Sequence, residues 1–468
     1  MSSSKFKLIP TAITMAAVAV VFTGVVLKHT TSSSGSGIML AEFTSKDEQA
    51  KFLPINPENE TLRSPKLTKI YERESSHKRL LKGPETPIVD PDTGILYVLT
   101  EEANLVSLTD VQPMQKPQSS TAKASRVSAK ATLIADLGIG RPLGAAFAKD
   151  KDNKTIIYVA DTLAGLLRVS NLNSNNDGPD ATSTTRPTSN KPKVELVASS
   201  FQETNGINGQ TTTTTSRRIL YANDVDVGPI TGHVYFSDAS DIAPERTPVD
   251  GEGFSSWDTM TAYKRDLLRA RPTGRLLRYK PETNEVDVLL DGLWFANGVA
   301  VDRNEDYVIV TETSKLRETQ YNLNVNDNDD DDDDEYKNDD LTKILVDSLP
   351  GFPDGLTCDR DSGEKDQVCY AAMPSPKIPL INILNAVPAS ISMFLRTLLL
   401  QLPASAFGAI KPVNYGGVAK IRTRSGDVSI LQDPKGEEIG LITGLTVFDK
   451  KLYMGSLVND FVGVYDLS

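Results

Sequence analysis

Cysteine and histidine are scarce in this chain. Both bind soft metals, and cysteine also forms the disulfides that stabilise small folds. Its 468 residues include only two cysteines and three histidines, His29, His77 and His233. Two cysteines exclude a disulfide framework as the basis of the fold, and a chain of this length can bury a core without one. Soft transition metals prefer histidine and cysteine ligands. The composition therefore directs the search for a site toward oxygen ligands.

Excess positive charge is also lacking, since the formal net charge is −12. Residues 327–340 hold ten acids against Lys337 and account for −9 of this value. The rest of the chain is near balance and offers no basic face, which excludes nucleic acid as a partner. The acidic run is typical of a solvated insertion; weak superficial calcium binding is the alternative.

One long apolar stretch is present, at residues 8–27, flanked by lysines. Its 20 residues match the thickness of a bilayer, and no small-residue cleavage site follows it. We expect an uncleaved signal-anchor, with residues 1–7 as a cytosolic tail and 28–65 as a flexible stalk. The lysines before the stretch favour a type II orientation, with the body in the lumen of the secretory pathway or outside the cell.

Three features bear on this orientation. The Asn-x-Thr sequons at Asn59 and Asn153 would be glycosylation acceptors on the lumenal side. The two cysteines, Cys358 and Cys369, flank a predicted hairpin turn. They would form a cross-strand disulfide in an oxidising compartment, with a pair of ordinary buried thiols as the alternative.

Short strands dominate the rest of the sequence, and one strand signature recurs six times. Its cores are spaced 61, 77, 74, 61 and 83 residues apart, which suits one four-stranded sheet per repeat. Six such sheets predict an all-β fold, a six-bladed β-propeller over residues 66–468. The cores are Leu96-Tyr97-Val98, Ile157-Tyr158-Val159, Val234-Tyr235-Phe236, Val308-Ile309-Val310, Cys369-Tyr370-Ala371 and Leu452-Tyr453-Met454.

Insertions and the chain ends complete this prediction. Residues 66–72 are expected to add an outer strand to the last blade, which closes the ring. Segments 112–132, 172–217 and 326–340 have low complexity and are predicted to be surface loops. Segment 374–411 is apolar, but three prolines interrupt it, so we expect one or two short helices in the blade 5–6 region. These helices pack on a blade, cover the tunnel mouth or contact the membrane.

Oxygen-bearing side chains precede the repeated cores at matching distances. Glu85, Asn223 and Asn297 each lie 12 residues before the central position of a core, and Asp354 lies 16 residues before it. Equivalent positions of units arranged around one axis converge. Two carboxylates and two amides form a ligand set that suits Ca²⁺. The repeat therefore predicts a calcium site from Glu85, Asn223, Asn297 and Asp354.

Several ordered motifs resemble the strictosidine synthase-like family. They are Gly83-Pro84-Glu85, Arg141-Pro142-Leu143-Gly144, Asn223-Asp224-Val225-Asp226, Thr231 to Asp238, Gly274 to Tyr279, Phe295-Ala296-Asn297-Gly298 and Gly351-Phe352-Pro353-Asp354. The resemblance covers roughly residues 66–468. The superfamily also includes paraoxonases and gluconolactonases, which are six-bladed propellers with calcium in the central tunnel. The resemblance implies calcium ligation by the same four residues.

The chain departs from these relatives at positions that carry chemistry. The glutamate that strictosidine synthases use in the last blade corresponds to Thr443, which argues against amine–aldehyde condensation. The histidine dyad of paraoxonases corresponds to Leu143 and Thr162. Asp224 resembles a ligand of a second calcium, but the acid expected beside Glu85 is Thr86.

We therefore expect a calcium-dependent hydrolase of small esters or lactones, similar to an arylesterase. Calcium would polarise the carbonyl group, and Asp354 or Asp224 would be the base that activates water. The alternative is a non-catalytic, membrane-tethered propeller with structural calcium. Asp161, Asp238 and Glu312, each three residues after a core position, are predicted to cap strand ends.

Overall fold

A computed structural model describes most of the chain beyond residue 59. The tail, the predicted anchor at 8–27, Asn59 and segment 326–340 lie outside the described residues. The described residues are 60–62, 66–73, 79–114, 124–138, 140–172, 191–207, 210–249, 255–324, 341–361, 363, 366–403 and 413–468.

Strands dominate these residues, and most belong to four-stranded antiparallel units in which consecutive strands pair. The first three units are β3 (Pro87–Val89), β4 (Leu96–Leu99), β5 (Asn104–Pro113) and β6 (Ser125–Asp136); β7 (Pro142–Lys149), β8 (Thr155–Asp161), β9 (Gly165–Ser170) and β10 (Lys193–Ala198); and β13 (Ala222–Val227), β14 (Val234–Asp238), β17 (Gly274–Lys280) and β18 (Glu285–Leu293).

The remaining units follow the same order. They are β19 (Ala296–Val301), β20 (Tyr307–Glu312), β21 (Arg317–Asn322) and β22 (Thr342–Val346); β24 (Leu356–Cys358), β25 (Val368–Met373), β27 (Gly416–Arg422) and β28 (Val428–Asp433); and β29 (Ile442–Phe448), β30 (Lys451–Ser456) and β31 (Phe461–Asp466), which β2 (Leu67–Glu72) completes.

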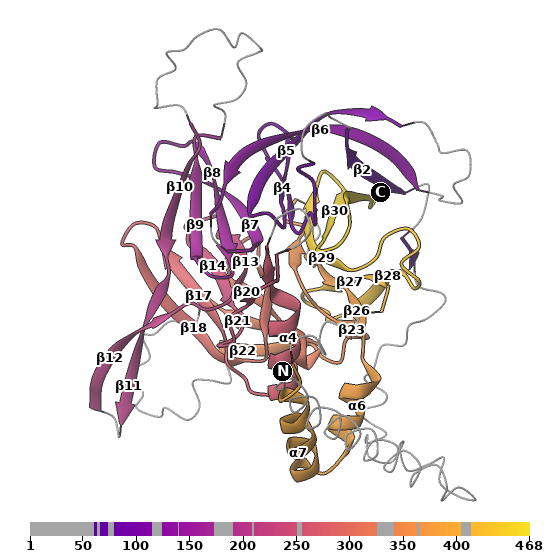
Figure 1. Cartoon of the computed structure of the whole chain (residues 1–468). Coiled ribbons are helices and arrows are strands. Elements are labelled where there is room, and N and C mark those ends of the chain that lie inside the picture. The colour runs from indigo at the N-terminus through magenta and orange to yellow at the C-terminus, as the bar shows by residue number, and fades with distance from the viewer. Residues whose placement is uncertain are drawn as a thin grey trace, which may run out of the picture.

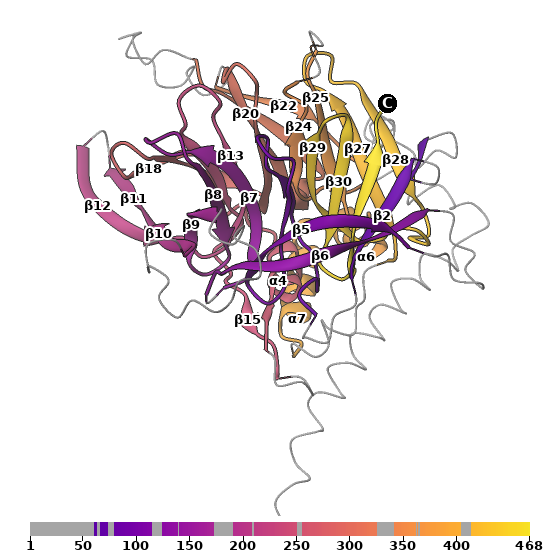
Figure 2. The ribbon, with the colours of Figure 1, turned by 90° about the horizontal axis from the view of Figure 1, so that it is seen from above.

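The first strands of the units line the centre of the molecule. They contact one another in the order β3, β7, β13, β19, β24 and β29, and β29 contacts β3 again. Figures 1 and 2 show the sheets fanned around this centre. The arrangement is propeller-like, with apolar side chains from adjacent sheets packed between them, where burial of apolar surface stabilises the ring.

The two ends of the described chain meet in one sheet. β2 pairs antiparallel with β31, from Leu67 opposite Tyr465 to Tyr71 opposite Phe461. The prediction of an outer strand at residues 66–72 is thus confirmed. β2 also pairs in parallel with β6, which joins the first and last units into one eight-stranded sheet.

Two predictions, that of the stalk and that of two surface loops, are wrong in part. Residues 28–65 do not form a stalk throughout, because β1 (Glu60–Thr61) pairs in parallel with β28 and the next residue, Leu62, is fully buried. Segments 112–132 and 172–217 are not only loops. Strands β5, β6 and β10 reach into them, and β11 (Ser200–Ile207) forms a hairpin with β12 (Gln210–Arg218). Runs of threonine favour extended chain because the side chain is β-branched.

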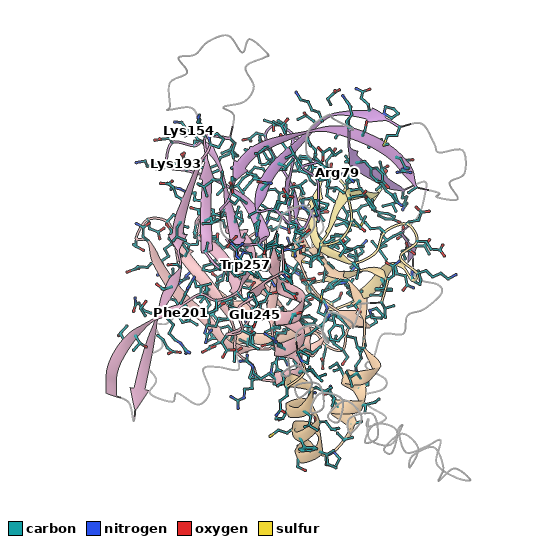
Figure 3. The ribbon with its side chains drawn as sticks, in the orientation of Figure 1. Arg79, Lys154, Lys193, Phe201, Glu245 and Trp257 are labelled. Atoms are coloured by element: carbon teal, nitrogen blue, oxygen red, sulfur yellow. A yellow bond between two sulfur atoms is a disulfide. The ribbon has the colours of Figure 1, made fainter. Side chains whose placement is uncertain are left out.

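The described helices gather at one end of the ring (Figure 1). α4 (Thr259–Arg269) begins after Asp258, whose side chain accepts a hydrogen bond from the Thr261 amide at 2.8 Å. The ribbon of β15 (Glu245–Arg246) and β16 (Trp257–Asp258), whose residues Glu245 and Trp257 are labelled in Figure 3, precedes it. The Glu245 carboxylate accepts a hydrogen bond from Arg265 at 2.5 Å.

The apolar segment 374–411 contains two short helices, as predicted. They are α6 (Pro379–Ala386) and α7 (Ala389–Leu400), and β23 (Gly351–Phe352) pairs with β26 (Ser375–Pro376) just before them. α7 contacts α4, where the Arg396 guanidinium donates to the Leu267 carbonyl at 2.9 Å. In the described part of the chain, no helix is long and apolar enough to cross a membrane.

Candidate functional site

Local irregularities place one residue of each unit toward the centre. In β13, β19 and β29, the residue at the predicted site position has no pairing partner in the second strand of its unit. In β7, the pairing register shifts at the equivalent point. A β-bulge of this kind turns a side chain out of the regular alternation. The residues concerned are Leu143, Asn223, Asn297 and Thr443; Glu85 and Asp354 occupy the matching positions just before β3 and β24.

These residues form a partition between two cavities. We call this set the central ring; it comprises Glu85, Leu143, Asn223, Asn297, Asp354 and Thr443. All six line both a large cavity of about 680 Å³ on one side and a small cavity of about 110 Å³ on the side of the helices. The structure therefore brings together the four predicted ligands with Leu143 and Thr443, two of the positions where the chain departs from its relatives; Thr162 lines neither cavity.

Close contact between neighbouring first strands makes the ring narrow. A Cβ atom on Gly298 would lie 2.5 Å from the Asp354 carbonyl oxygen, and one on Gly144 would lie 2.5 Å from the Asp224 Cα atom. Real Cβ atoms do not approach other atoms so closely, so these strands pack together only because both positions are glycine. Glycine next to a ring residue thus lets the ring side chains converge.

The two carboxyl groups of the ring are buried and favour their neutral forms without a cation. Burial raises the pKa of Glu85 to about 8, opposed by the positive charge of Arg141 and reinforced by Asp354. Burial also raises the pKa of Asp354 to about 7, while the Asn297 amide beside it favours the charged form. Bringing positive charge between the two groups would reverse both shifts.

The donor set fits calcium. Glu85 Oε2 is buried and has no hydrogen-bond partner. Thr443 Oγ1 likewise makes no bond of standard geometry, although it lies near enough to Glu85 to favour the charged carboxylate. All the polar ring side chains offer oxygen, the atom that Ca²⁺ prefers. Within the described ranges, no three His, Cys, Asp or Glu side chains are grouped to hold a metal; the ring itself has two acids and two amides.

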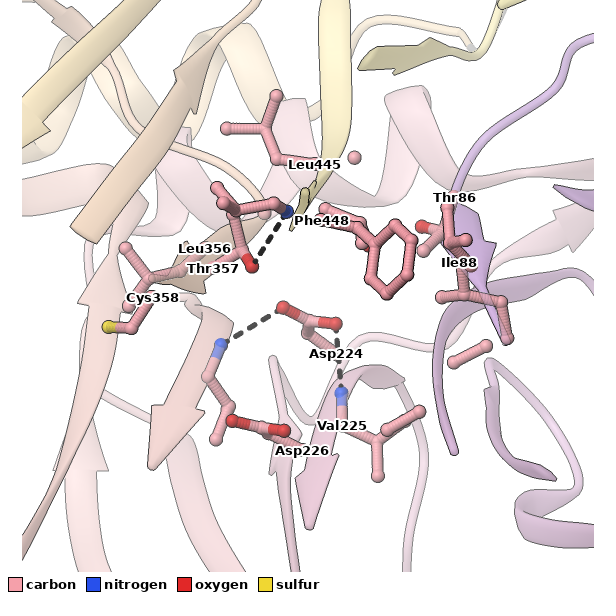
Figure 4. Close-up of a pocket in the computed structure, with 18 of the residues that line it drawn as sticks. Thr86, Ile88, Asp224, Val225, Asp226, Leu356, Thr357, Cys358, Leu445 and Phe448 are labelled. Atoms are coloured by element: carbon pink, nitrogen blue, oxygen red, sulfur yellow. Dashed lines mark hydrogen bonds between the residues drawn. The ribbon is translucent and has the colours of Figure 1, made fainter. Parts of the chain in front are cut away.

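Asp224 has a structural role. Its carboxylate accepts hydrogen bonds from the Val225 amide at 2.9 Å and the Val299 amide at 3.0 Å (Figure 4). The Leu356 amide also bonds to it. Asp224 thereby ties together β13, β19 and β24. Burial still raises its pKa to about 7. Asp224 lines the large cavity but not the small one.

Other polar groups of the large cavity are also engaged. Thr86, at the position where relatives have an acid, donates its hydroxyl proton to the Leu143 carbonyl. Asp226 accepts from Arg360 at 2.5 Å and from the Val301 amide at 2.8 Å. A second cation would have to displace these bonds, so the structure gives no support to a second calcium here.

The acids that lie three residues after the strand cores cap strand ends or loops, as predicted. Asp161 accepts from the Leu163 and Ala164 amides at 3.1 and 2.9 Å. Asp238 accepts from the Tyr221 amide at 2.9 Å. Glu312 accepts from the Trp294 amide at 3.0 Å.

Sequence reasoning missed the wall of the small cavity. Five residues of α4 line it: Thr259 at the start of the helix, and Met260, Tyr263, Lys264 and Leu267 at positions i, i+3, i+4 and i+7 of one helical face. This spacing after the capping residue Asp258 is a helix signal that could have been found in the sequence. Tyr221, Phe295 and Phe352 complete an apolar, aromatic wall around the cavity.

Two predicted modification sites fall within the described residues. Cys358 and Cys369 face each other across β24 and β25 and are joined in a disulfide. Asn153 lies exposed in the turn between β7 and β8.

Comparison with known families identifies part of this architecture. The strictosidine synthase family model matches residues 223–326, from the ring residue Asn223 through β21. This segment of the chain is similar to strictosidine synthases. The resemblance inferred from the motifs is thereby confirmed.

The relatives that this chain is similar to differ in how much of it they match. Adipocyte plasma membrane-associated protein of Salmo salar is 25% identical over 429 residues, which are 89% of this chain and 85% of the relative. Protein strictosidine synthase-like 2 of Arabidopsis thaliana is 31% identical over 217 residues, 46% of this chain and 43% of the relative.

Solved structures with a similar backbone are more distant. A gluconolactonase of Xanthomonas campestris matches with a TM-score of 0.44 and 12% identity, covering 83% of this chain and 86% of that protein. Regucalcin of Agrobacterium tumefaciens, described as a calcium-binding protein, matches with a TM-score of 0.41 and 11% identity, covering 85% of this chain and 94% of that protein.

Proposed function

We propose that this protein is a membrane-anchored, calcium-binding, six-bladed propeller that hydrolyses small esters or lactones. The observation that carries the proposal is the central ring, where a buried, unpartnered Glu85 oxygen and further oxygen donors face two cavities. We infer six blades because six first strands contact one another in a closed cycle.

Four of the six ring residues have a defined part in this proposal. Glu85, Asn223, Asn297 and Asp354 would hold Ca²⁺. Bound calcium would supply a Lewis acid that polarises the ester or lactone carbonyl. Asp354 is the preferred base for water. Asp224 is less suitable because it is bonded to backbone amides and lines only the large cavity, whereas Asp354 lines both cavities. A carboxylate that also ligates calcium is a weak base, so we expect slow turnover.

The experiment combines a metal assay with an activity assay on the purified full chain. Calcium content and hydrolysis of phenyl acetate and a lactone panel are measured with and without EDTA. We expect Glu85→Ala and Asn297→Ala to lose both calcium and activity. Asp361→Ala, on the rim of the large cavity, is the matched control and should keep both. Activity that survives EDTA and both ring substitutions would remove calcium from the reaction.

A second function, a non-catalytic propeller with structural calcium, is favoured by Thr443 and Leu143. Neither side chain can act as an acid or base, and both occupy the central ring. This alternative predicts a large calcium-dependent rise in melting temperature with no turnover of any ester or lactone. Amine–aldehyde condensation is the least supported function, because it needs the carboxylate that Thr443 replaces.

We also propose a type II membrane protein whose body faces an oxidising compartment. The disulfide supports this orientation, as does the exposed position of the Asn153 sequon. A second membrane contact through α7 is supported by the exposed fractions of Ile391, Met393 and Phe394, which are 46%, 67% and 60%. Glycosidase digestion that leaves the mobility of the full-length protein unchanged would argue against the orientation. Deletion of 378–403 from an anchorless form tests the contact, and unchanged membrane partition would remove it.

A further inference from the structure

Two hydroxyl groups at the wall of the small cavity have no hydrogen-bond partner. Tyr263 Oη, from α4, is shielded from solvent and unpaired. Thr313 is 5% exposed, and its Oγ1 is likewise unpaired. Buried polar groups in native proteins almost always find a partner because leaving them unpaired is unfavourable. A pair of such groups on one cavity therefore points to a ligand.

A second tyrosine in the same cavity provides the contrast. The Tyr221 hydroxyl donates to the Thr259 carbonyl at 3.0 Å and so ties β13 to the start of α4. Tyr221 is explained by the fold. Tyr263 lines the same cavity and has no such bond.

The ring of Tyr263 is held in place by its neighbours. Its centroid lies 4.9 Å from that of Phe295 and 6.2 Å from that of Phe352, both in edge-on geometry. Such aromatic pairs restrict the ring beyond simple burial. Tyr263 lines the same cavity as all six residues of the central ring. Its hydroxyl is thus fixed on the wall of the cavity that the ring closes.

The remaining wall indicates the kind of ligand. Met260, Leu267, Phe295, Phe352 and Leu457 contribute apolar surface, and Lys264 of α4 is the one cationic side chain that lines the cavity in the described part of the chain. A ligand with an apolar body and one or two oxygens would bury that body and satisfy the hydroxyls. A polyhydroxylated ligand would leave most of its own hydroxyls without partners against this wall, which is unfavourable.

We propose that Tyr263, assisted by Thr313, binds an oxygen of an uncharged, apolar ester or lactone and so positions it over the central ring. The inference rests on the proposed function, because it names the substrate contact of the same site. The ligand would bind on the side of the central ring where the helices lie. There α4 would form the wall that contacts the ligand.

The test uses the full chain in detergent and two carbonyl compounds of the same shape. Phenyl acetate reports turnover, and acetanilide, its amide counterpart, reports binding in a saturation-transfer NMR titration. In Tyr263→Phe we expect the KM for phenyl acetate and the Kd for acetanilide to rise about three- to tenfold, the loss of one hydrogen bond, with kcat little changed. Tyr279→Phe is the matched control, because its hydroxyl bonds to Asn284 at 2.8 Å and it lines neither cavity; it should leave acetanilide binding unchanged.

The outcomes separate this inference from the proposed function. If acetanilide binds and weakens only in Tyr263→Phe, the contact stands even when phenyl acetate is not turned over; in that case hydrolysis alone is rejected. Failure of the unaltered chain to bind acetanilide would overturn the contact. Equal binding in Tyr263→Phe, or equal weakening in both variants, would do the same.

Discussion

Calcium should stabilise this protein far more at alkaline than at acidic pH. Without the cation, Glu85 and Asp354 have pKa values raised to about 8 and 7. In the unfolded chain both titrate near their ordinary values, about 4. Between these limits the unfolded state loses protons that the folded state keeps, so the stability of the calcium-free protein falls as pH rises and the loss is complete above pH 8.

The size of the effect follows from the pH interval between the pKa values of each carboxyl group in the unfolded and folded states. One pH unit is worth about 1.4 kcal/mol for each group that titrates in only one state. From pH 5 to pH 8, Glu85 alone costs about 4 kcal/mol, and Asp354 adds about 3 kcal/mol up to pH 7. A calcium ion that pairs with both carboxylates removes this penalty. Native domains are stable by about 5–15 kcal/mol, so the calcium-free protein should be close to unfolding at pH 8.

The assay is thermal unfolding at pH 5, 6, 7 and 8, with EDTA or with excess calcium. We expect a negligible calcium shift at pH 5 and a shift on the order of 10 °C at pH 8. Calorimetry in buffers of different ionisation enthalpy should show protons released on binding at pH 6 that are no longer released at pH 9. Glu85→Gln should flatten the dependence on pH in EDTA. An equal calcium shift at pH 5 and pH 8, or an unchanged slope in Glu85→Gln, would refute the reasoning.

Three further predictions concern the packing and access of the ring. Gly298→Ala should destabilise the protein by about 2 kcal/mol because the new Cβ has no space between first strands, and urea unfolding measures this; no loss would contradict the close approach. Replacing Cys358 and Cys369 by serine should cost about 3 kcal/mol, the loop-closure value for a separation of 11 residues, without changing calcium content. Met260→Trp should fill the small cavity and abolish ester turnover, whereas Phe448→Trp, in the large cavity, should not; the reverse result would place the substrate on the other side.

Four ring residues could be found from the sequence because their positions are local. In each unit the ring residue lies at a set distance from the hairpin that follows, so counting back from the strand core reaches it. The longer count to Asp354 reflects the turn between β24 and β25, which residues 359–367 form. The same logic predicted β2, since a strand with no partner of its own must join the last sheet.

The rest depends on contacts between distant parts of the chain. The sequence does not reveal that Leu62 is buried against another sheet or that Thr86 bonds to the Leu143 carbonyl. The same holds for Asp224, which seemed a candidate base because an acid beside a ligand suggests chemistry. Its three backbone partners come from strands about 75 to 130 residues away or from its own neighbour, and no local pattern encodes them.

The two sides of the ring differ in a way that bears on whether it does chemistry. On the large side, Asp226 is paired with Arg360 and Asp224 is bonded to amides, so these acids serve the fold. On the small side, the wall is apolar apart from a few groups such as Tyr263 and Thr313. Asp354 is then the only ring acid left to accept a proton if Glu85 serves as a ligand. A site with one compromised base could hydrolyse activated esters slowly, while the calcium that we propose would hold the first strands together. The residues of the central ring thus fit calcium binding and the packing of the first strands better than they fit catalysis.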